Sequence, residues 1–271
     1  MSAANNLECE GRVAIVTGAS RGIGAAIAER LAEAGAKVAC AARTVERVDR
    51  YEGSLQETVE QITASGGQAI AIRADLNVRD DRAALVEQTV QQLGPVDILV
   101  NNGAITYYMP FTEFTEKRWR LMFEVQVRAP YELAQTVVPG MVERGQGWIL
   151  NISSRAAVHP PGPPFNPVHR EWGFSVYGMV KGALDRFSTG LAAELYEDGI
   201  RVNSLAPWDN VATPGASTHD LVDEFALEEV SLMAEAALAL CSGPTTLTGN
   251  VAYSQPLLAQ LQRRPPPRSD T

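Results

Sequence analysis

A tyrosine and a lysine four residues apart, Tyr177 and Lys181, have the types and spacing that could support proton transfer. If residues 175–191 form a helix, the two side chains lie one turn apart on the same face. A free phenol has a pKa of about 10 and is a poor acid or base at neutral pH, whereas a nearby ammonium favours the phenolate. A core ring beside a solvated charge is the commoner meaning of such spacing. The pair therefore indicates catalysis only if the chain also provides a hydride carrier and a carbonyl site.

The composition argues against several other classes of protein. The chain has 271 residues, a formal net charge of −9 and no long basic run, so neither nucleic acid nor a membrane surface is expected as a partner. No segment is apolar over a bilayer-spanning length, and residues 1–10 are polar and acidic, unlike a signal peptide. The three cysteines are widely spaced and the three histidines lack metal-ligand spacing. We therefore expect a cytoplasmic protein with reduced thiols and no metal site.

Short apolar runs alternate with longer helical patterns along most of the chain. This alternation predicts a single α/β domain over residues 1–262, with a doubly wound, Rossmann-type parallel sheet flanked by helices on both faces. The proline-rich residues 263–271 are predicted to be a disordered tail or an arm that lies over a neighbouring subunit. We expect the long helical region 115–144 to be interrupted near Pro139. The predicted strands are 12–17, 37–42, 68–73, 96–101, 148–152, 200–206 and 250–253, and the other predicted helices are 22–34, 54–65, 79–93, 175–191 and 227–241.

The turn between the first predicted strand and helix could bind a dinucleotide. Residues 17–24 have the sequence TGASRGIG, in which three glycines are spaced Gly-x3-Gly-x-Gly. Glycines at such a turn let the backbone approach a pyrophosphate, and the helix N-terminus provides N–H donors and a favourable dipole. The spacing differs from the common G-x-G-x-x-G pattern, but its position between a strand and an amphipathic helix predicts a cofactor site.

The end of the second predicted strand bears on the choice of nicotinamide cofactor. A carboxylate there would bind the ribose 2′-hydroxyl of NAD and repel the 2′-phosphate of NADP. The strand is instead followed by Arg43, and Arg21 extends from the glycine turn. Two guanidinium groups without an acid favour a phosphate, so we predict NADP(H) as the preferred cofactor, with NAD(H) as the alternative. Either arginine taken alone could equally be a solvated surface residue without a role in cofactor binding.

Further motifs follow in order along the chain. They are Asp75-Leu76, NNGA at 101–104, NISS at 151–154, Tyr177-x3-Lys181 and RVNS at 201–204. With the glycine turn, this combination resembles the classical short-chain dehydrogenase/reductase family over residues 12–213. The bridging segments resemble the branch of that family called hydroxysteroid-dehydrogenase-like.

The resemblance implies hydride transfer between a nicotinamide and the carbon of a carbonyl or alcohol. Tyr177 would be the general acid or base, and Ser154 would hold the substrate oxygen. Lys181 would hold the nicotinamide ribose and lower the pKa of the phenol, and Thr213 would bind the carboxamide. A homodimer or homotetramer acting on a small molecule is also implied. The other expected cofactor contacts are Gly18, Ser20, Arg21, Gly22, Ile23, Gly24, Arg43, Asp75, Leu76, Asn102, Gly103, Pro207 and Val211.

Four positions depart from the family pattern. Gln126 stands where the family has a catalytic Asn, and its longer amide would either hold the relay water or face a helix neighbour. The loop NNGA replaces the usual NNAG. Trp208 follows Pro207 where the family has glycine, so the indole would lie near the nicotinamide, line the substrate pocket or simply pack. The chain lacks the family's glycine-rich C-terminal end, which leaves the partner of the last strand open.

The segment 159–174, between the serine and the tyrosine, bears on the substrate. Phe165, Trp172 and Phe174 would either wall a pocket for a medium-sized apolar ketone, aldehyde or alcohol, or anchor the segment to the body. Residues 214–220 resemble the start of the family's mobile substrate loop. Two functions remain open: a carbonyl/alcohol oxidoreductase, which the intact catalytic set favours, and a cofactor-binding regulator or scaffold, which Gln126 and Trp208 motivate.

Overall fold

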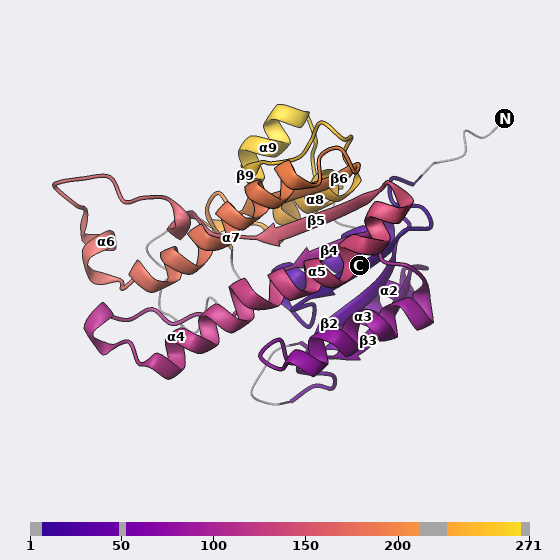
Figure 1. Cartoon of the computed structure of the whole chain (residues 1–271), viewed down its shortest axis with the longest axis horizontal. Helices are drawn as coiled ribbons and strands as arrows, with labels where there is room; N and C mark the ends of the chain where they lie inside the picture. The colour runs from indigo at the N-terminus through magenta and orange to yellow at the C-terminus, as the bar shows by residue number, and fades with distance from the viewer. Residues whose placement is uncertain (1–6, 49–52, 212–226, 267–271) are drawn as a thin grey trace.

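In the computed structural model, which describes residues 7–48, 53–211 and 227–266, seven parallel strands form the central sheet. Their order is β3-β2-β1-β4-β5-β6-β9, so the winding direction reverses between β1 and β4 (Figure 1). The doubly wound parallel sheet predicted from the sequence is confirmed. The strands are β1 (Val13–Thr17), β2 (Lys37–Ala42), β3 (Gln68–Arg73), β4 (Ile98–Asn101), β5 (Gly147–Ile152), β6 (Ile200–Ala206) and β9 (Val251–Tyr253).

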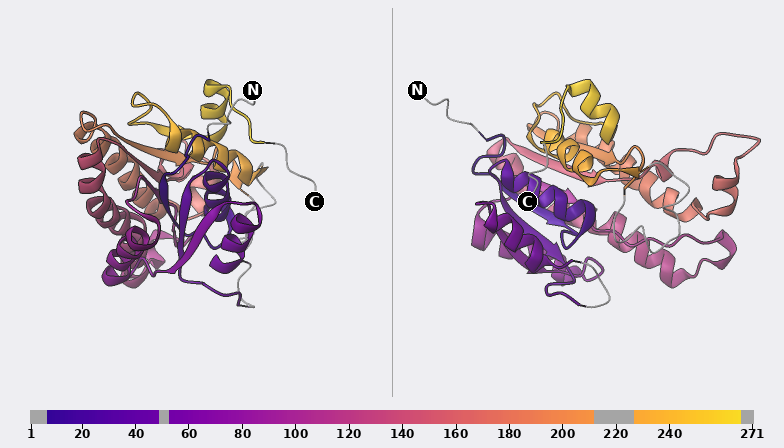
Figure 2. Two further views of the ribbon diagram at one scale, coloured as in Figure 1. Left: turned by 90° about the vertical axis from the view of Figure 1, so that its right-hand side faces the viewer. Right: turned by 180° about the vertical axis from the view of Figure 1, so that it is seen from behind.

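Helices cover both faces of the sheet (Figures 1 and 2). α1 (Gly22–Glu33), α2 (Leu55–Ala64) and α8 (Val230–Ser242) pack on one face. α3 (Arg79–Leu93), α5 (Ala129–Arg144) and α7 (Ser175–Glu194) pack on the other. In the parts of the chain that the structure describes, no helix has both the length and the apolar character needed to cross a bilayer.

The apolar run of β1 shows why the central strands lack a polar face. Ala14 and Val16 belong to the core cluster under α1, whereas Val13 and Ile15 belong to the cluster under α3 and α5. Successive side chains of a strand point to opposite faces, and both faces of a parallel sheet are covered by helices. All five residues of β1 are buried, as the continuous apolar sequence predicts.

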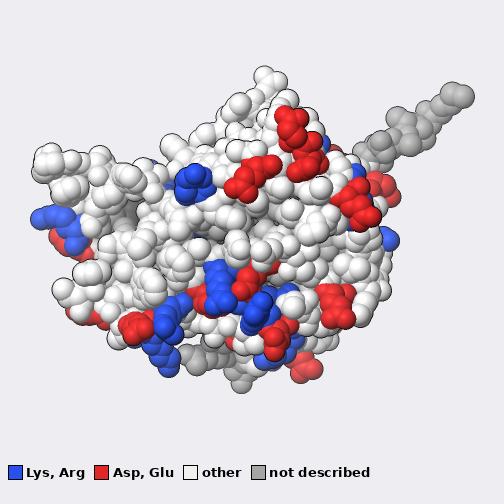
Figure 3. Space-filling model, viewed as in Figure 1, with Lys and Arg blue, Asp and Glu red and all other residues white. Residues whose placement is uncertain are grey.

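A lobe built from η1 (Phe111–Glu113), α4 (Glu116–Phe123) and α6 (Pro167–Glu171) extends beyond the ends to which the strands point (Figures 1 and 2). In the space-filling view, charged side chains lie over much of the visible face, including the α6 part of the lobe, where Arg170 pairs with Glu171 (Figure 3). The lobe therefore places a surface that includes exposed charges beside the carboxyl ends of the strands.

The predicted interruption near Pro139 is wrong. α5 continues through this proline to Arg144, and the helical path widens earlier, in a π-helical turn, η2 (Glu124–Arg128). The proline costs one backbone hydrogen bond, but packing on the sheet stabilises the rest of the helix. Single π-helical turns are common at functional sites, which draws attention to the residues of η2.

Two further differences concern the C-terminal region. The predicted helix 227–241 begins only at Val230, because Leu227–Glu228 (β8) pairs with Asn210–Val211 (β7) in a separate small sheet. The last strand, β9, pairs in parallel with β6 and is followed by α9 (Ser254–Leu261). Arg263, the first residue of the predicted tail, forms ion pairs with Glu8 and Glu235, and residues 267–271 lie outside the described part.

Arg82 holds the π-helical turn against the body of the protein. It is only 2% exposed, and its guanidinium binds Glu124 of η2 at 3.0 Å and Glu132 of α5 at 2.7 Å. The same group donates to the carbonyl oxygen of Leu76 at 2.5 Å. One buried cation thus connects α3, η2, α5 and the segment after β3.

We expect Arg82→Leu to lower the free energy of unfolding by about 3 kcal/mol, because it leaves two partly buried carboxylates without their cation. Urea denaturation at neutral pH would measure the change. Arg120→Leu removes an ion pair with Glu116 in which both side chains are more than 70% exposed, and we expect this control to change stability by less than about 1 kcal/mol. Similar losses in the two variants would contradict the role of Arg82.

Candidate active site

A cavity of about 630 Å³ opens at the carboxyl ends of β1, β2 and β4, where the strand order reverses. Open α/β sheets bind ligands at such a switch point. Segments that are far apart in the sequence meet there: the glycine turn, the end of β2, and the residues after β3 and β4. The predicted cofactor residues that line it are Gly18, Ser20, Arg21, Gly22, Ile23, Gly24, Arg43, Asp75, Leu76, Asn102 and Gly103.

The glycine turn is shaped by close backbone contacts that exclude side chains. A Cβ atom on Gly24 would collide with the carbonyl oxygen of Gly18, and one on Gly103 would lie 2.6 Å from Leu76 Cδ1. Gly18 has a φ of +68°, which favours glycine. The missing side chains leave the cradle that a pyrophosphate requires, so these residues fit a dinucleotide.

Asn102 supports the glycine turn from behind. Its Nδ2 donates to the carbonyl oxygens of Thr17 at 2.9 Å and Gly18 at 3.3 Å. The hydroxyl of Thr17 in turn accepts from the backbone N–H groups of Asn102 and Gly103, both at 3.0 Å. The neighbouring Asn101 is buried and donates to Asn151. The amide of Asn102 therefore positions the turn, and its side chain is occupied by backbone contacts.

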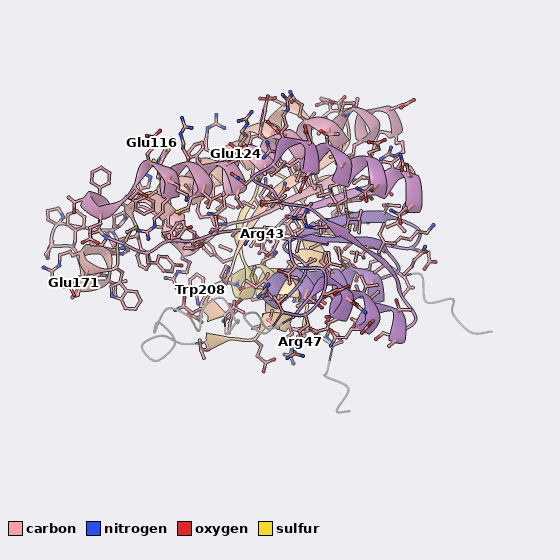
Figure 4. The ribbon with its side chains drawn as sticks, turned by 90° about the horizontal axis from the view of Figure 1, so that it is seen from below. Arg43, Arg47, Glu116, Glu124, Glu171 and Trp208 are labelled. Atoms are coloured by element: carbon pink, nitrogen blue, oxygen red, sulfur yellow. The ribbon has the colours of Figure 1, made fainter. Side chains whose placement is uncertain are left out.

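The cavity wall after β2 carries the two predicted arginines. Arg21 donates to Thr44 Oγ1 at 3.4 Å, while Arg43 is exposed at the end of β2 (Figure 4). Asp75, which also lines the cavity, accepts from the backbone N–H of Asn77 at 3.0 Å, so its carboxylate closes a local turn. No acidic side chain follows β2 within residues 43–45, which is consistent with room for an anion beside the arginines.

Four hydroxyl groups meet at the N-terminal end of α7. Tyr177 and Lys181 lie one turn apart on this helix, as their spacing predicts. Ser154, Thr106 and Tyr108 place their hydroxyls near that of Tyr177, where they act to lower its pKa. Ser154 follows β5, and both Thr106 and Tyr108 belong to the segment after β4. The structure thus brings the predicted Ser154 and Tyr177 together and adds two hydroxyls that the sequence interpretation missed.

Burial has the largest effect on the pKa values of Tyr177 and Lys181. It raises the pKa of Tyr177 above the ordinary value of a phenol, while the hydroxyls of Ser154, Thr106 and Tyr108 act in the opposite direction. Burial also lowers the pKa of Lys181 to about 8, against the favourable charge of Asp185. The lysine Nζ donates to the carbonyl oxygen of Ile152 at 2.7 Å and lies 5.8 Å from the centre of the Tyr177 ring.

Gln126 occupies the middle of the π-helical turn and is 1% exposed. Its Nε2 donates to the carbonyl oxygen of Ile105 at 2.7 Å, so the amide faces the segment after β4 and not a helix neighbour. Its Oε1 is buried and has no hydrogen-bond partner among the described residues. A buried acceptor of this kind is expected to bind water or another donor.

Trp208, after β6, follows one of the three alternatives left open by the sequence, in which the indole packs against neighbouring side chains. Trp208 lies edge-on to Tyr253, with ring centres 5.8 Å apart, and the guanidinium of Arg155 lies 5.0 Å from the indole (Figure 4). The indole thus packs in a small cluster between β6 and β9. Pro207 is half-buried, Val211 is buried in the core, and neither lines the cavity described above; Thr213 and residues 214–220 lie outside the described residues.

The segment 159–174 is anchored to the body at its C-terminal end. Phe174 lies edge-on to Tyr108 at 5.3 Å, and Trp172 lies 6.1 Å from Phe174. A side chain on Gly173 would collide with the backbone of Met109. Phe165 is 45% exposed. Two of the three predicted aromatic residues therefore anchor the segment and also form a wall beside Tyr177, whereas the third lies at the surface of the lobe.

Comparisons with known proteins agree with this geometry. The sequence model of the family described as short chain dehydrogenase matches residues 12–219. An uncharacterized oxidoreductase of Methylorubrum extorquens is 37% identical over 244 residues, which are 90% of each chain. A short chain dehydrogenase of Pseudocercospora fijiensis is 38% identical over 202 residues, covering 74% of this chain and 60% of the relative. The crystal structure of a short chain dehydrogenase from Mycobacterium thermoresistibile has a TM-score of 0.80 at 33% identity, covering 94% of this chain and 89% of the other.

Two other relatives bear on the branch and the cofactor. Hydroxysteroid dehydrogenase-like protein 2 of Bos taurus is 30% identical over 260 residues, which are 94% of this chain and 59% of that protein. The resemblance to that branch is therefore distant. A metagenomic short-chain oxidoreductase solved in complex with NADP has a TM-score of 0.74 at 29% identity, covering 91% of this chain and 97% of the other.

Proposed function

Because the chain belongs to the short-chain dehydrogenase/reductase family and is an NAD(P)-dependent oxidoreductase, we propose that it interconverts a carbonyl and an alcohol with Tyr177 as the general acid or base. The observation that carries this proposal is the proximity of Ser154 to Tyr177, which packs in one cluster with Ile105, a residue of the cavity lining. A carbonyl oxygen placed between Ser154 and Tyr177 would receive two hydrogen bonds in a partly buried position.

The cofactor supplies the hydride, and the residues of this chain supply position and a proton. In the direction of reduction, Ser154 holds the substrate oxygen and Tyr177 donates its proton to that oxygen as the negative charge develops. The raised pKa of Tyr177 keeps the phenol protonated at neutral pH, which favours reduction. The ammonium of Lys181 has three N–H donors, of which one binds Ile152; the others remain for a ribose hydroxyl.

The substrate that suits this site is a medium-sized apolar carbonyl compound or alcohol. The wall formed by Tyr108 and Phe174 presents aromatic edges next to Tyr177. NADP(H) is the cofactor that the arginines after β1 and β2 favour. A homo-oligomer remains a proposal by analogy with the family.

Consumption of NADPH with a panel of ketones and aldehydes tests this function. We expect turnover with at least one apolar ketone, and slower turnover when its chain carries a carboxylate. If NADPH raises the melting temperature but no carbonyl or alcohol is converted in either direction, a cofactor-binding regulator replaces the enzyme as the better interpretation.

Gln126 provides a second test of the site. We propose that its unpartnered Oε1 binds a water molecule of the proton path, because this oxygen is buried and the amide nitrogen beside it donates to Ile105, the residue before Thr106. Gln126→Leu, which keeps the approximate volume, is expected to lower kcat about tenfold, and Gln126→Asn to lower it less. Measurements of kcat in H2O and D2O would show a larger solvent isotope effect in the Leu variant. Unchanged kcat in both variants would remove Gln126 from the proton path.

A further inference from the structure

Arg155, the residue after Ser154, has no part in the proton transfer described above, yet it makes two contacts with Trp208. Its Nη1 donates to the carbonyl oxygen of Trp208 at 2.8 Å, and its guanidinium carbon lies 5.0 Å from the centre of the indole ring. Trp208 follows β6, the strand that pairs with β5. The two contacts therefore attach the residue beside Ser154 to the end of the neighbouring strand.

Trp208 is held in place by further contacts. Its backbone N–H donates to Glu228 Oε2 at 3.1 Å and to Ser254 Oγ at 3.0 Å, and its ring lies edge-on to that of Tyr253. Glu228 and Ser254 are both buried, and the serine hydroxyl donates to the carboxylate at 2.7 Å. Because displacing hydrogen-bonded buried groups is costly, Trp208 is a fixed point to which the arginine can be attached.

The turn that begins after Ser154 packs against the helix that carries Tyr177. This turn, η3 (Arg155–Ala157), is a short 3-10 helix in contact with α7. A Cβ atom on Gly178, the residue after Tyr177, would lie only 2.5 Å from the carbonyl oxygen of Ala156. The backbones of η3 and α7 therefore approach closely, directly beside the proposed proton donor.

The same turn orients the hydroxyl group of Ser154. Ser154 is the N-cap of η3, and its Oγ accepts from the backbone N–H of Ala156 at 3.2 Å. Since a backbone N–H occupies one lone pair of Oγ, the hydroxyl proton is directed away from Ala156, as donation to a substrate oxygen requires. The position of η3 on α7 therefore sets where Ser154 and Tyr177 can bind one oxygen together.

We propose that Arg155 and Trp208 are positioning residues, which hold η3 against α7 and thereby set the position of Ser154 relative to Tyr177. The proposal rests on the proposed function, because it concerns the same substrate oxygen. A displacement of about 1 Å at a reacting group can lower a rate about 100-fold, so a modest contact outside the site has a measurable effect. Arg155 acts through Ser154, and Trp208 acts through Arg155.

Arg155→Met removes the guanidinium and keeps a long, unbranched side chain. We expect kcat of carbonyl reduction, per bound NADPH, to fall about tenfold. The dissociation constant of NADPH should change less than about twofold, because other residues line the cofactor cavity. Arg155→Lys keeps a charge and a donor, so its kcat should remain within about threefold of the wild-type value.

Arg201→Met is the matched control for the loss of an arginine stacked on an indole. The guanidinium of Arg201 lies 4.7 Å from the ring centre of Trp148, near the N-terminal end of β6 and so at the opposite end of this strand from Trp208. We expect kcat of this control to stay within about twofold of the wild-type value.

The contribution of the indole is tested by two substitutions of Trp208. Trp208→Leu removes the aromatic face but leaves the backbone carbonyl that Arg155 binds, so we expect about a fivefold loss of kcat; Trp208→Phe should lose less than about twofold. The double variant Arg155→Met/Trp208→Leu should lose about tenfold, as Arg155→Met does alone, instead of the about 50-fold product of independent effects. Multiplicative losses would contradict a shared role of the two side chains.

Hydrogen exchange reports on η3 without any substrate. The backbone N–H groups of Ala156, Ala157 and Val158 all donate to oxygens of residues 154 and 155. Deuterium uptake in a peptide covering residues 154–158, measured by mass spectrometry, should be about tenfold faster in Arg155→Met and in Trp208→Leu. Uptake in Arg201→Met should equal that of the wild type.

The proposal is overturned if uptake over residues 154–158 is unchanged in Arg155→Met, or if uptake accelerates while kcat keeps the wild-type value. A loss of NADPH affinity as large as the loss of kcat would also overturn it, since a general loss of structure has that effect. The exchange measurement succeeds or fails separately from the proposed function. Faster uptake in a protein that converts no carbonyl would support the attachment of η3 and contradict the reductase, whereas turnover with unchanged uptake would do the reverse.

Discussion

Tyr177→Phe should lower carbonyl turnover about 1,000-fold while NADPH binding changes less than about threefold. The substitution removes only the hydroxyl, and the ring remains packed with Tyr108 and the cluster around Met122, Val176 and Val180. The glycine turn and the arginines lie on other elements and keep their geometry. Removing a positioned proton donor raises the barrier of the chemical step without removing the surfaces that bind the cofactor.

Steady-state kinetics with the best ketone of the panel, together with fluorescence titration of NADPH, would measure both quantities. Tyr196→Phe is the matched control, because this tyrosine follows the C-terminal end of α7 and is 51% exposed. We expect kcat of the control to equal that of the wild type. A kcat of Tyr177→Phe within tenfold of the wild-type value would show that another group donates the proton.

The elements that carry the cofactor cavity were predictable from the sequence because their signals are local. β1, the glycine turn and α1 are consecutive, and the apolar run, the glycines and the helical periodicity each appear within residues 12–34. The spacing of Tyr177 and Lys181 is likewise a property of one helix. The chain order of these elements was enough to predict the doubly wound sheet, because parallel strands are joined by right-handed crossovers.

The surroundings of Tyr177 were harder to predict because they depend on packing between distant segments. Thr106 and Tyr108 lie in an irregular segment, and only the fold brings their hydroxyls to α7. Three hydroxyl residues at 106–108, separated from NNGA by Ile105 alone, are in hindsight a signal of a polar site. The π-helical turn has no such signal, since it depends on the buried ion pairs of Arg82 rather than on propensity.

The electrostatic role first assigned to Lys181 also changes with the structure. The sequence predicts an ammonium that favours the phenolate from one turn away, but Nζ binds the carbonyl oxygen of Ile152 and its own pKa is lowered by burial. Desolvation is a property of the folded core and cannot be derived from a spacing of four residues. The side chains that lower the pKa of Tyr177 against the effect of burial are hydroxyls from other segments.

Arg43→Asp should weaken NADPH binding about 50-fold and change NADH binding less than about threefold. Arg43 lines the cavity at the end of β2, the position at which a carboxylate selects NAD. The substitution removes a guanidinium that could pair with the 2′-phosphate and introduces a negative charge that repels it. NADH carries a hydroxyl at that place, which a carboxylate can accept from, so its affinity should be maintained or improved.

Arg47→Asp makes the same change of charge nearby and serves as the control (Figure 4). Arg47 is exposed, pairs with Glu57 at 3.3 Å and is absent from the cavity lining, so its loss should alter both affinities less than about threefold. Dissociation constants for NADPH and NADH at two salt concentrations would separate the loss of a direct contact with Arg43 from the long-range electrostatic effect of the changed net charge. If Arg43→Asp weakened both cofactors equally, the arginine would contact the part they share, and the preference for NADP would need another origin.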